Sequence, residues 1–551
     1  MKFLKRALKQ APKFLAFALF WWKFRWMRTI SKGVNPGRTV LFVNFTDWAP
    51  RAKLDGVIVA ALRMRGVKPI VLTERKCTWS VRTLRALGVE DFLFLEDFLA
   101  EAEKEFRGMD FSALLQKHYS FAGLYDFSWK EIGVGRHVLS TVVRQMKGGG
   151  ASFDDPGVRS ELQKWFPISM RVAAAARLLF RRLRPDAVLF LEKGYTPYGE
   201  LFDAALAENL NTIQYFHGHR SDLLVMRRFH SANRFEHPFA LSQKSWERVK
   251  GLPWTQAQEE TFMAELRKSY EEGSWMNRKF LLKGKKLKDP SEVRAQLHLD
   301  PKKKTAVIFS HVLWDATFFF GENLYPDYEQ WLIATVRAAC ENPQVNWIVK
   351  LHPDYVWKMK QMGQSAAPRD ILALQSEIGE LPSHIQVVAP DTDISTYSFF
   401  AVTDYCITVR GTIGIEAPCF SIPVITAGTG RYSGLGFTDD SKTREEYLEK
   451  LRAIQNHPKL SEERTSLARR HAWALFALRP LPFTSCEIAP RPGAKSFEQD
   501  AVMRVHSQKD LEHAPDLKAF TDWILESKDE DYLNLSSNFS PQSCTKLHLT
   551  K

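Results

Sequence analysis

Short apolar runs alternate with amphipathic stretches in two separate blocks of the chain. The first block has strand-length runs at 39–43, 69–72, 92–95, 187–191 and 212–216. The second has them at 305–309, 346–350, 385–388, 404–409 and 423–426. The segments between the runs place apolar residues at helical spacing, as at 52–65. Strands that alternate with helices predict parallel sheets with helices on their faces, so the sequence predicts an α/β protein.

The length of 551 residues exceeds one ordinary core, so we expect two Rossmann-like domains that face a ligand cleft. A mainly helical insertion is expected at 97–185, inside the first domain. The predicted units are a basic amphipathic segment at 1–38, an N-terminal domain at 39–250, a linker at 251–300, a C-terminal domain at 301–492 and a partly disordered tail at 493–551.

The net charge of +14 is concentrated at the N-terminus, where residues 1–46 contain ten Lys or Arg and no Asp or Glu. Residues 14–22 are apolar and include Trp21 and Trp22. We interpret residues 1–33 as an amphipathic helix on an anionic membrane surface. A helix packed on its own domain and a nucleic-acid arm are the alternatives. Without an aromatic stacking motif elsewhere, we expect no nucleic-acid partner.

The remaining composition constrains the compartment. No apolar run approaches the length of about 20 residues that spans a bilayer. The six cysteines have no zinc-type spacing and are expected to be reduced thiols, which favours a cytoplasmic location. We therefore predict a protein peripheral to the inner face of the inner membrane.

Two motifs follow predicted strands of the second block. In Lys350-Leu-His-Pro353, His352 can donate a hydrogen bond to a phosphate oxygen and Pro353 fixes the turn. Lys350 either adds charge there or lies inside the strand. Because ligands bind beyond the carboxyl ends of strands in open α/β sheets, this turn is predicted to bind a phosphate or nucleotide.

The second motif is Arg410-Gly-Thr-Ile-Gly-Ile-Glu416. A glycine-rich turn that opens a helix presents backbone N–H groups to a phosphate, with the Thr412 hydroxyl beside them. Gly411 and Gly414 would permit close approach, and Glu416 would hold ribose hydroxyls. Pro418 is expected to kink or shorten this helix.

Further candidates lie near these motifs. His311 follows the first strand of the second block, and Arg431 lies in a glycine-rich run at 428–436. Both are predicted donor contacts. Asp391 and Asp393 form a DxD string, but Asp393 is better explained as a helix cap, so we expect no metal site.

A general base would come from the other side of the cleft. Four residues follow strand ends of the first block and are candidates for accepting a proton from an acceptor hydroxyl: Asp47, Glu192, His217 and His219. The sequence does not select among them, and Asp47 is equally suited to cap the helix that follows it.

Residues 305–440 resemble the GT-B glycosyltransferases of bacterial capsule and surface-polysaccharide assembly. The resemblance is carried by Val349–Pro353, Arg410–Ala417, Ile422–Ile425 and Gly428–Thr438. The family includes sialyl- and Kdo-transferase-like enzymes and CDP-glycerol transferases. It implies a metal-independent enzyme without a cofactor that moves a sugar from a CMP- or UDP-linked donor to a lipid-linked or growing polysaccharide.

Two other functions stay open. A CDP-alcohol-dependent polyol-phosphate transferase would use the same nucleotide site. A non-catalytic, nucleotide-binding component of a polysaccharide assembly complex would keep the site without the transfer reaction.

Overall fold

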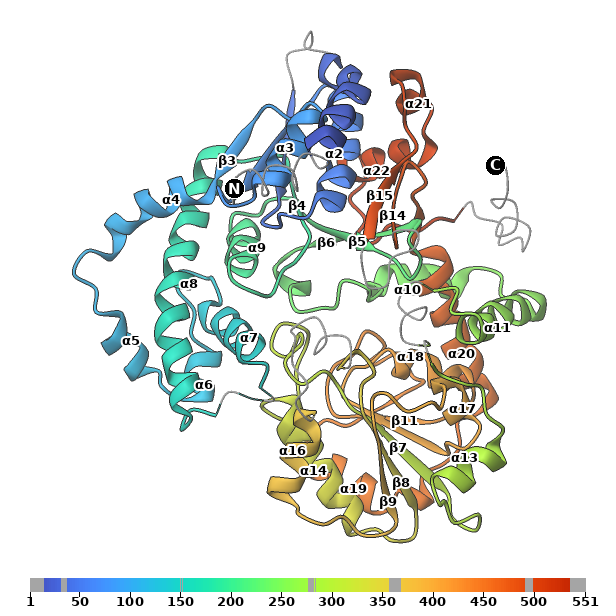
Figure 1. Cartoon of the computed structure of the whole chain (residues 1–551). Helices are drawn as coiled ribbons and strands as arrows, with labels where there is room; N and C mark the ends of the chain where they lie inside the picture. Colours follow the sequence, from blue (N-terminus) through green and yellow to red (C-terminus); the bar gives the residue numbers. More distant parts are fainter. Residues whose placement is uncertain are drawn as a thin grey trace, which may run out of the picture.

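The computed structural model describes residues 14–30, 37–148, 150, 152–275, 282, 284–355, 368–490 and 499–535. They form two α/β domains, with the N-terminal one at the top of Figure 1 and the C-terminal one below it. Each is built on its own sheet, of seven and six strands. The predicted architecture of two Rossmann-like domains is therefore confirmed.

The N-terminal sheet has the order β13-β6-β5-β4-β1-β2-β3. Its strands are β1 (Arg38–Val43), β2 (Val67–Thr73), β3 (Phe92–Phe94), β4 (Ala187–Phe190), β5 (Thr212–His217), β6 (Leu223–Phe229) and β13 (Leu481–Pro482). β1 pairs in parallel with both β2 and β4. The strand order therefore reverses between β1 and β4, and such a switch point opens a ligand crevice at the carboxyl ends. β6 and the edge strand β13 extend this sheet by antiparallel pairing, and the sequence did not predict either of them.

Helices cover both faces of this sheet. They are α2 (Ala49–Met64), α3 (Thr78–Ala86), α4 (Leu95–Ala102), α5 (Phe111–Lys117), α6 (Phe121–Tyr125), α7 (Val134–Met146), α8 (Pro156–Leu183) and α9 (Tyr198–Ala207). In α8, Leu162, Phe166 and Met170 recur every four residues and are fully buried. This spacing places them on one face, which packs into the core.

The C-terminal sheet is parallel, with the order β12-β11-β10-β7-β8-β9. Its strands are β7 (Thr305–Phe309), β8 (Asn346–Lys350), β9 (Ile385–Val388), β10 (Tyr405–Thr408), β11 (Val424–Thr426) and β12 (Asp439–Asp440). Its helices are α14 (Tyr328–Cys340), α16 (Arg369–Glu377), α17 (Thr396–Phe400), α18 (Ile413–Cys419), α19 (Arg444–Arg452) and α20 (Glu462–Trp473).

The predicted linker is built into the C-terminal domain. It contains all of α11 (Gln256–Glu271) and α13 (Pro290–Gln296), and α10 (Gln243–Gly251) ends at its first residue. Phe262 and Leu266 of α11 are buried in one cluster with residues of β7, β10 and α18. The predicted boundaries at 251 and 300 therefore do not separate a loose segment, because α11 carries an apolar face that the domain covers.

The C-terminal end of the chain returns to the N-terminal domain. It forms the hairpin β14 (Cys486–Pro490) and β15 (Gln499–Met503), then α21 (Gln508–Glu512) and α22 (Pro515–Leu525). Figure 1 shows this red segment beside the blue α2. Leu517, Phe520 and Ile524 of α22 join the core that contains α2 and β5. Residues 499–535 of the predicted tail at 493–551 are thus structured, and the rest of that tail lies outside the described residues.

The N-terminal segment forms a helix over 14–23 and then η1 (Arg25–Thr29). Phe24, Met27 and Ile30 are buried in the core beneath α2. The Arg63 guanidinium donates hydrogen bonds to the Met27 carbonyl at 3.0 Å and the Ile30 carbonyl at 2.8 Å. Among the described residues, no helix is long and apolar enough to cross a membrane.

Candidate functional site

Both sequence motifs lie at one edge of the C-terminal sheet. β7 is the central strand, with β8 on one side and β10 on the other. The strands are parallel, so His311 after β7, His352 after β8 and Arg410 after β10 meet at the carboxyl edge.

His311 joins two of these strand ends. Its Nε2 accepts a hydrogen bond from the Val409 backbone N–H at 3.2 Å and lies 3.2 Å from the Thr408 hydroxyl. The ring stacks on Tyr328 at 4.4 Å between centroids. Burial, with the neighbouring His352 ring and the charge of Arg410, holds the pKa of His311 well below its ordinary value. The imidazole is therefore neutral, and its Nε2 lone pair is used for a hydrogen bond within the protein.

The His352 ring is oriented by its own turn. Its backbone N–H donates to the Ser310 hydroxyl at 3.0 Å, and its Nδ1 accepts from the Asp354 N–H at 3.2 Å. The hydrogen of a neutral ring is therefore on Nε2, the atom predicted to donate to a phosphate. Pro353 completes the turn, in which the Tyr355 N–H donates to the His352 carbonyl at 3.2 Å.

Lys350 lies inside β8 and is only 5% exposed. Burial, together with the nearby Lys285, lowers the pKa of Lys350 to about 7. Its ammonium lies 5.6 Å from the Phe399 ring centroid. The sequence allowed Lys350 either to add charge at the turn or to lie inside the strand, and the structure has it inside the strand.

The glycine-rich turn opens α18 without a side-chain cap from Thr412, which has helical backbone angles. The Gly411 N–H donates to the Thr408 hydroxyl at 3.3 Å. A Cβ added at Gly414 would overlap the Tyr432 ring. The hydroxyl of Tyr432 donates to the Gly411 carbonyl at 3.1 Å. Gly414 is therefore needed for Tyr432 to pack beneath the turn, a reason different from the predicted approach of a phosphate.

Glu416 is only 7% exposed and accepts a hydrogen bond from the Tyr270 hydroxyl. Tyr270 comes from α11 and stacks on Tyr397 at 5.6 Å. The helix continues through Pro418 and ends at Cys419, so the expected shortening is seen in its length of seven residues.

Two arginines converge beside this turn. Arg410 is 6% exposed, and its Nη2 donates to Asn323 Oδ1 and, at 3.4 Å, to the Glu322 carbonyl. Its Nε and Nη1 are buried without a hydrogen-bond partner among the described residues. The same holds for Nε of Arg431, whose guanidinium lies 5.8 Å from the Phe239 ring. Buried donors without acceptors are costly, so this arrangement favours an anionic ligand.

A loop of the C-terminal domain contacts the N-terminal domain across the cleft. The Tyr195 hydroxyl donates to Asp315 Oδ1 at 3.1 Å and accepts from the Ala316 N–H at 3.0 Å. The Gly321 N–H donates to the Phe235 carbonyl at 2.7 Å. These bonds hold the carboxyl edges of the two sheets together.

The four predicted base candidates have different surroundings. Asp47 is exposed, and its carboxylate accepts from the Ser80 N–H at 2.8 Å, so it caps α3 and not α2. Glu192 is half-buried at the end of β4, accepts from the Lys193 N–H at 2.7 Å, and has its pKa raised by burial. Burial and Arg51 lower the pKa of His217 to about 4. The His219 ring packs on Trp275 at 4.4 Å.

The structure adds residues that the sequence did not single out. Besides Tyr270 and Asn323, His237 packs on Phe320 of the C-terminal domain at 4.5 Å. Burial and the charge of Arg431 hold the pKa of His237 well below its ordinary value. The dipeptide His237-Pro238 has the same sequence as His352-Pro353. This likeness was the one feature of the sequence that could have pointed to His237.

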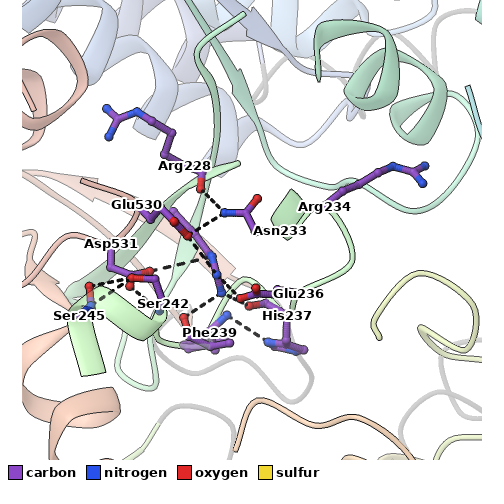
Figure 2. Close-up of polar contacts among 12 residues, drawn as sticks. Arg228, Asn233, Arg234, Glu236, His237, Phe239, Ser242, Ser245, Glu530 and Asp531 are labelled. Atoms are coloured by element: carbon purple, nitrogen blue, oxygen red, sulfur yellow. Dashed lines mark hydrogen bonds and ion pairs between the residues drawn. The ribbon is translucent and has the colours of Figure 1, made fainter. Parts of the chain in front are cut away.

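The loop that carries His237 is fixed by the network in Figure 2, which includes Glu236, Ser242 and Asp531. Buried Arg227 donates to the His237 carbonyl at 2.8 Å and the Ala240 carbonyl at 2.9 Å. The Ser242 N–H donates to Asp531 at 2.7 Å. The C-terminal end of the chain therefore supports the cleft.

Metal-binding geometry is not found in the described part of the chain, where no group of three or more His, Cys, Asp or Glu could hold an ion. Asp393 of the DxD string accepts from the Lys288 ammonium at 2.5 Å.

Residues 265–465 match the family model described as capsule polysaccharide biosynthesis protein. The matched region contains both motifs and the arginine pair. The match covers less than half of the chain, and over these residues the chain is similar to that family. This confirms the resemblance predicted from the two motifs. No curated protein matches the sequence.

Several solved structures show similarity to this chain. A β-Kdo 2,4 transferase, KpsC of Thermosulfurimonas dismutans, is 14% identical, with 58% of this chain and 85% of that chain covered and a TM-score of 0.33. A UDP-GlcNAc 2-epimerase from Neisseria meningitidis is 12% identical, with 79% and 95% covered and a TM-score of 0.26. The Anabaena HepE protein is 13% identical, with 81% and 95% covered and a TM-score of 0.27. The similarity to capsule polysaccharide biosynthesis proteins rests on the match over residues 265–465.

Proposed function

We propose that this protein is a glycosyltransferase that moves a sugar from a CMP- or UDP-linked donor to a lipid-linked or growing bacterial capsular or surface polysaccharide. The observation that carries the proposal is the pair Arg410 and Arg431, with buried N–H groups that lack acceptors among the described residues. A guanidinium keeps its charge at every physiological pH and matches phosphate geometry. The donor phosphate would accept from these groups at the opening of α18.

His352 and Glu416 complete the donor site in this proposal. His352 Nε2–H would donate to the same phosphate group. Glu416, held by Tyr270, would accept from the ribose hydroxyls. Catalysis then needs no cofactor, since the nucleotide-sugar is a substrate.

Glu192 is the base that the surroundings favour. It lies at the switch point between β1 and β4, and the charge of Asp315, from the opposite domain, helps to raise its pKa. A carboxylate with a raised pKa is a better proton acceptor for a hydroxyl near neutral pH. In an inverting reaction, Glu192 would take the proton of the acceptor hydroxyl as its oxygen attacks the anomeric carbon and the nucleotide leaves.

The proposed location is the cytoplasmic face of the inner membrane, where residues 1–33 would contact anionic lipid. Deleting residues 1–33 would be a poor test, because Phe24, Met27 and Ile30 belong to the core. Residues 1–13 and 31–36 lie outside the described residues.

Isothermal titration of the full chain with CMP, CDP and UDP tests the donor site. Arg410→Gln is expected to weaken nucleotide binding about tenfold or more, since a hydrogen bond to a charged group contributes about 1.5–3 kcal/mol. Asn323→Ala is the matched control, because it removes the internal partner of Arg410 and leaves the guanidinium in place. Equal affinities for wild type and Arg410→Gln would refute the donor site.

A further inference from the structure

Helix 14–23 exposes an apolar face on the outside of the N-terminal domain. The exposed fractions are 64% for Leu15, 61% for Leu19 and 64% for Trp22. These residues are spaced at i, i+4 and i+7, so they form one stripe along the helix. Twelve large apolar side chains are exposed among the described residues, and five of them lie between 14 and 22. Such a concentration marks an interaction surface.

The helix is firmly attached and is not a detached arm. Phe20 packs on Phe24 at 4.9 Å between ring centroids, and the Lys53 ammonium of α2 lies 5.6 Å from the Phe20 ring. Nη1 of Arg28 donates to the Ala86 carbonyl at the end of α3, at 3.2 Å. The opposite side of the helix is therefore docked on the domain, and the exposed stripe is held in a fixed orientation.

α3 extends this surface. Its Trp79 ring lies 6.1 Å from Phe14 and 6.0 Å from Phe17, which joins two segments far apart in the sequence. Arg82 and Arg85 of α3 are exposed, and Arg82 lies 5.2 Å from the Trp79 ring. We call helix 14–23, Trp79, Arg82 and Arg85 together the aromatic face.

The charge of this region has one sign. Neither 14–30 nor 78–86 contains Asp or Glu. Arg25 lies over the Trp22 ring at 4.3 Å, and Arg28 over the Trp21 ring at 4.4 Å. Indole rings beside cations suit the headgroup region of a bilayer, where the ring sits at the apolar boundary and the cation meets anionic headgroups.

The aromatic face reaches the carboxyl edge of the N-terminal sheet. Ser80, next to Trp79, donates its N–H to Asp47 at 2.8 Å and its hydroxyl to the Thr46 carbonyl at 2.6 Å. Thr46 and Asp47 belong to the loop after β1, at the strand edge whose β4 end contacts the C-terminal domain through Tyr195.

We propose that the aromatic face is a folded docking surface for an anionic bilayer, and that it brings the β1 end of the cleft to the lipid. It differs from a terminal anchor because α3 supplies part of it. The benefit for a lipid-linked acceptor rests on the proposed function, whereas the docking itself does not.

Co-sedimentation of the full chain with vesicles of phosphatidylcholine, with and without phosphatidylglycerol, tests the docking. Wild type is expected to bind the anionic vesicles, and Leu19→Glu to bind them at least about tenfold more weakly, because a charge replaces an exposed apolar side chain that would enter the bilayer. Leu372→Glu, at a 44% exposed leucine of α16, is the matched control and should bind like wild type.

A second pair of variants tests whether α3 takes part in the docking, as expected for a folded surface but not for a terminal anchor. The double variant Arg82→Ala, Arg85→Ala is expected to weaken anionic binding several-fold, while Arg248→Ala, an exposed arginine of α10, should not. Equal binding to neutral and anionic vesicles, or unchanged binding of both face variants, overturns the proposal. A dimer that Leu19→Glu dissociates, without vesicle binding, would assign the face to a second copy and overturn it as well.

Nucleotide titration of the same variants tests the proposed donor site separately from the proposed membrane docking. Leu19→Glu should bind CMP, CDP and UDP as wild type does, because the helix lies outside the donor site. Loss of vesicle binding with intact nucleotide binding therefore concerns the aromatic face alone.

Discussion

Burial decides which side chains at the cleft remain charged. The pKa of Lys350 falls to about 7, so its ammonium is a weaker source of fixed charge than the residue type suggests. Burial raises the pKa of Asp370 to about 7 in the same region. Arginine keeps its proton under such conditions. The lasting positive charge at the proposed donor site is therefore that of Arg410 and Arg431.

Glu192→Gln is expected to lower the transfer rate by about 10²–10⁴-fold, the usual contribution of a positioned general base. Nucleotide affinity should stay unchanged, since Glu192 lies on the opposite domain. The base acts only when deprotonated, and burial raises its pKa. The kcat/KM of wild type should therefore rise as pH increases through that raised pKa. Initial rates of transfer from a radiolabelled donor, measured across pH, check both expectations.

The matched control for this prediction is Asp47→Asn. Asp47 caps α3 and is exposed, so this change should reduce stability slightly and leave the pH profile of transfer intact. If Glu192→Gln kept the wild-type rate and pH profile while Asp47→Asn lost them, the assignment of the base would pass to Asp47.

At the scale of elements, continuous apolar runs predicted the parallel strands of both sheets except β12. β6 was missed because Arg227 and Arg228 interrupt its pattern. Arg227 is nevertheless fully buried, since its donors are accepted by the carbonyls of His237 and Ala240. A buried arginine becomes tolerable only through such partners, and their position is a property of the folded loop.

The sequence likewise predicted where the candidate site lies, but not all of its contacts. The strand ends located the turn at 350–353 and the loop at 410–416. The contact of Tyr270 with Glu416 could not be predicted, because 146 positions separate the two residues. α11 had been expected as linker, yet it provides the hydroxyl that orients the carboxylate.

Tyr270→Phe tests the role of α11 in the donor site. The change removes one hydroxyl while the ring and its stacking on Tyr397 remain. A hydrogen bond to a charged group contributes about 1.5–3 kcal/mol, so nucleotide affinity should fall about tenfold if Glu416 needs this partner to meet the ribose. Isothermal titration with UDP measures the effect. Tyr397→Phe keeps the Tyr270 hydroxyl and should bind UDP like wild type; a similar loss in both variants would indicate disturbed packing.

The whole molecule is held together by segments that are distant in the sequence. The chain completes the C-terminal domain and then adds β13 to the N-terminal sheet and α22 to its core. Asp531 meets Arg479 at 3.2 Å beneath the loop that carries His237. No local pattern identifies such a return, because α22 has an ordinary amphipathic sequence whose partner is decided by the tertiary fold.

Because α22 packs in the core of the N-terminal domain, we expect a mutation in α22 to destabilise that domain. Phe520 is fully buried and lies 5.5 Å from the Tyr215 ring of β5 and 6.0 Å from the Phe483 ring. Truncating a buried phenylalanine to alanine costs about 3–5 kcal/mol, through lost burial and the cavity that remains. Phe520→Ala should therefore speed hydrogen exchange in β1, β5 and α2, whereas β7 and β8 of the C-terminal domain should keep their protection. Exchange measured by mass spectrometry reports both regions in one experiment.

Leu451→Ala, at a fully buried residue of α19, is the reciprocal control and should affect the C-terminal domain instead. Faster exchange in β7 and β8 after Phe520→Ala, with β5 unchanged, would contradict the assignment of the C-terminal segment to the N-terminal core.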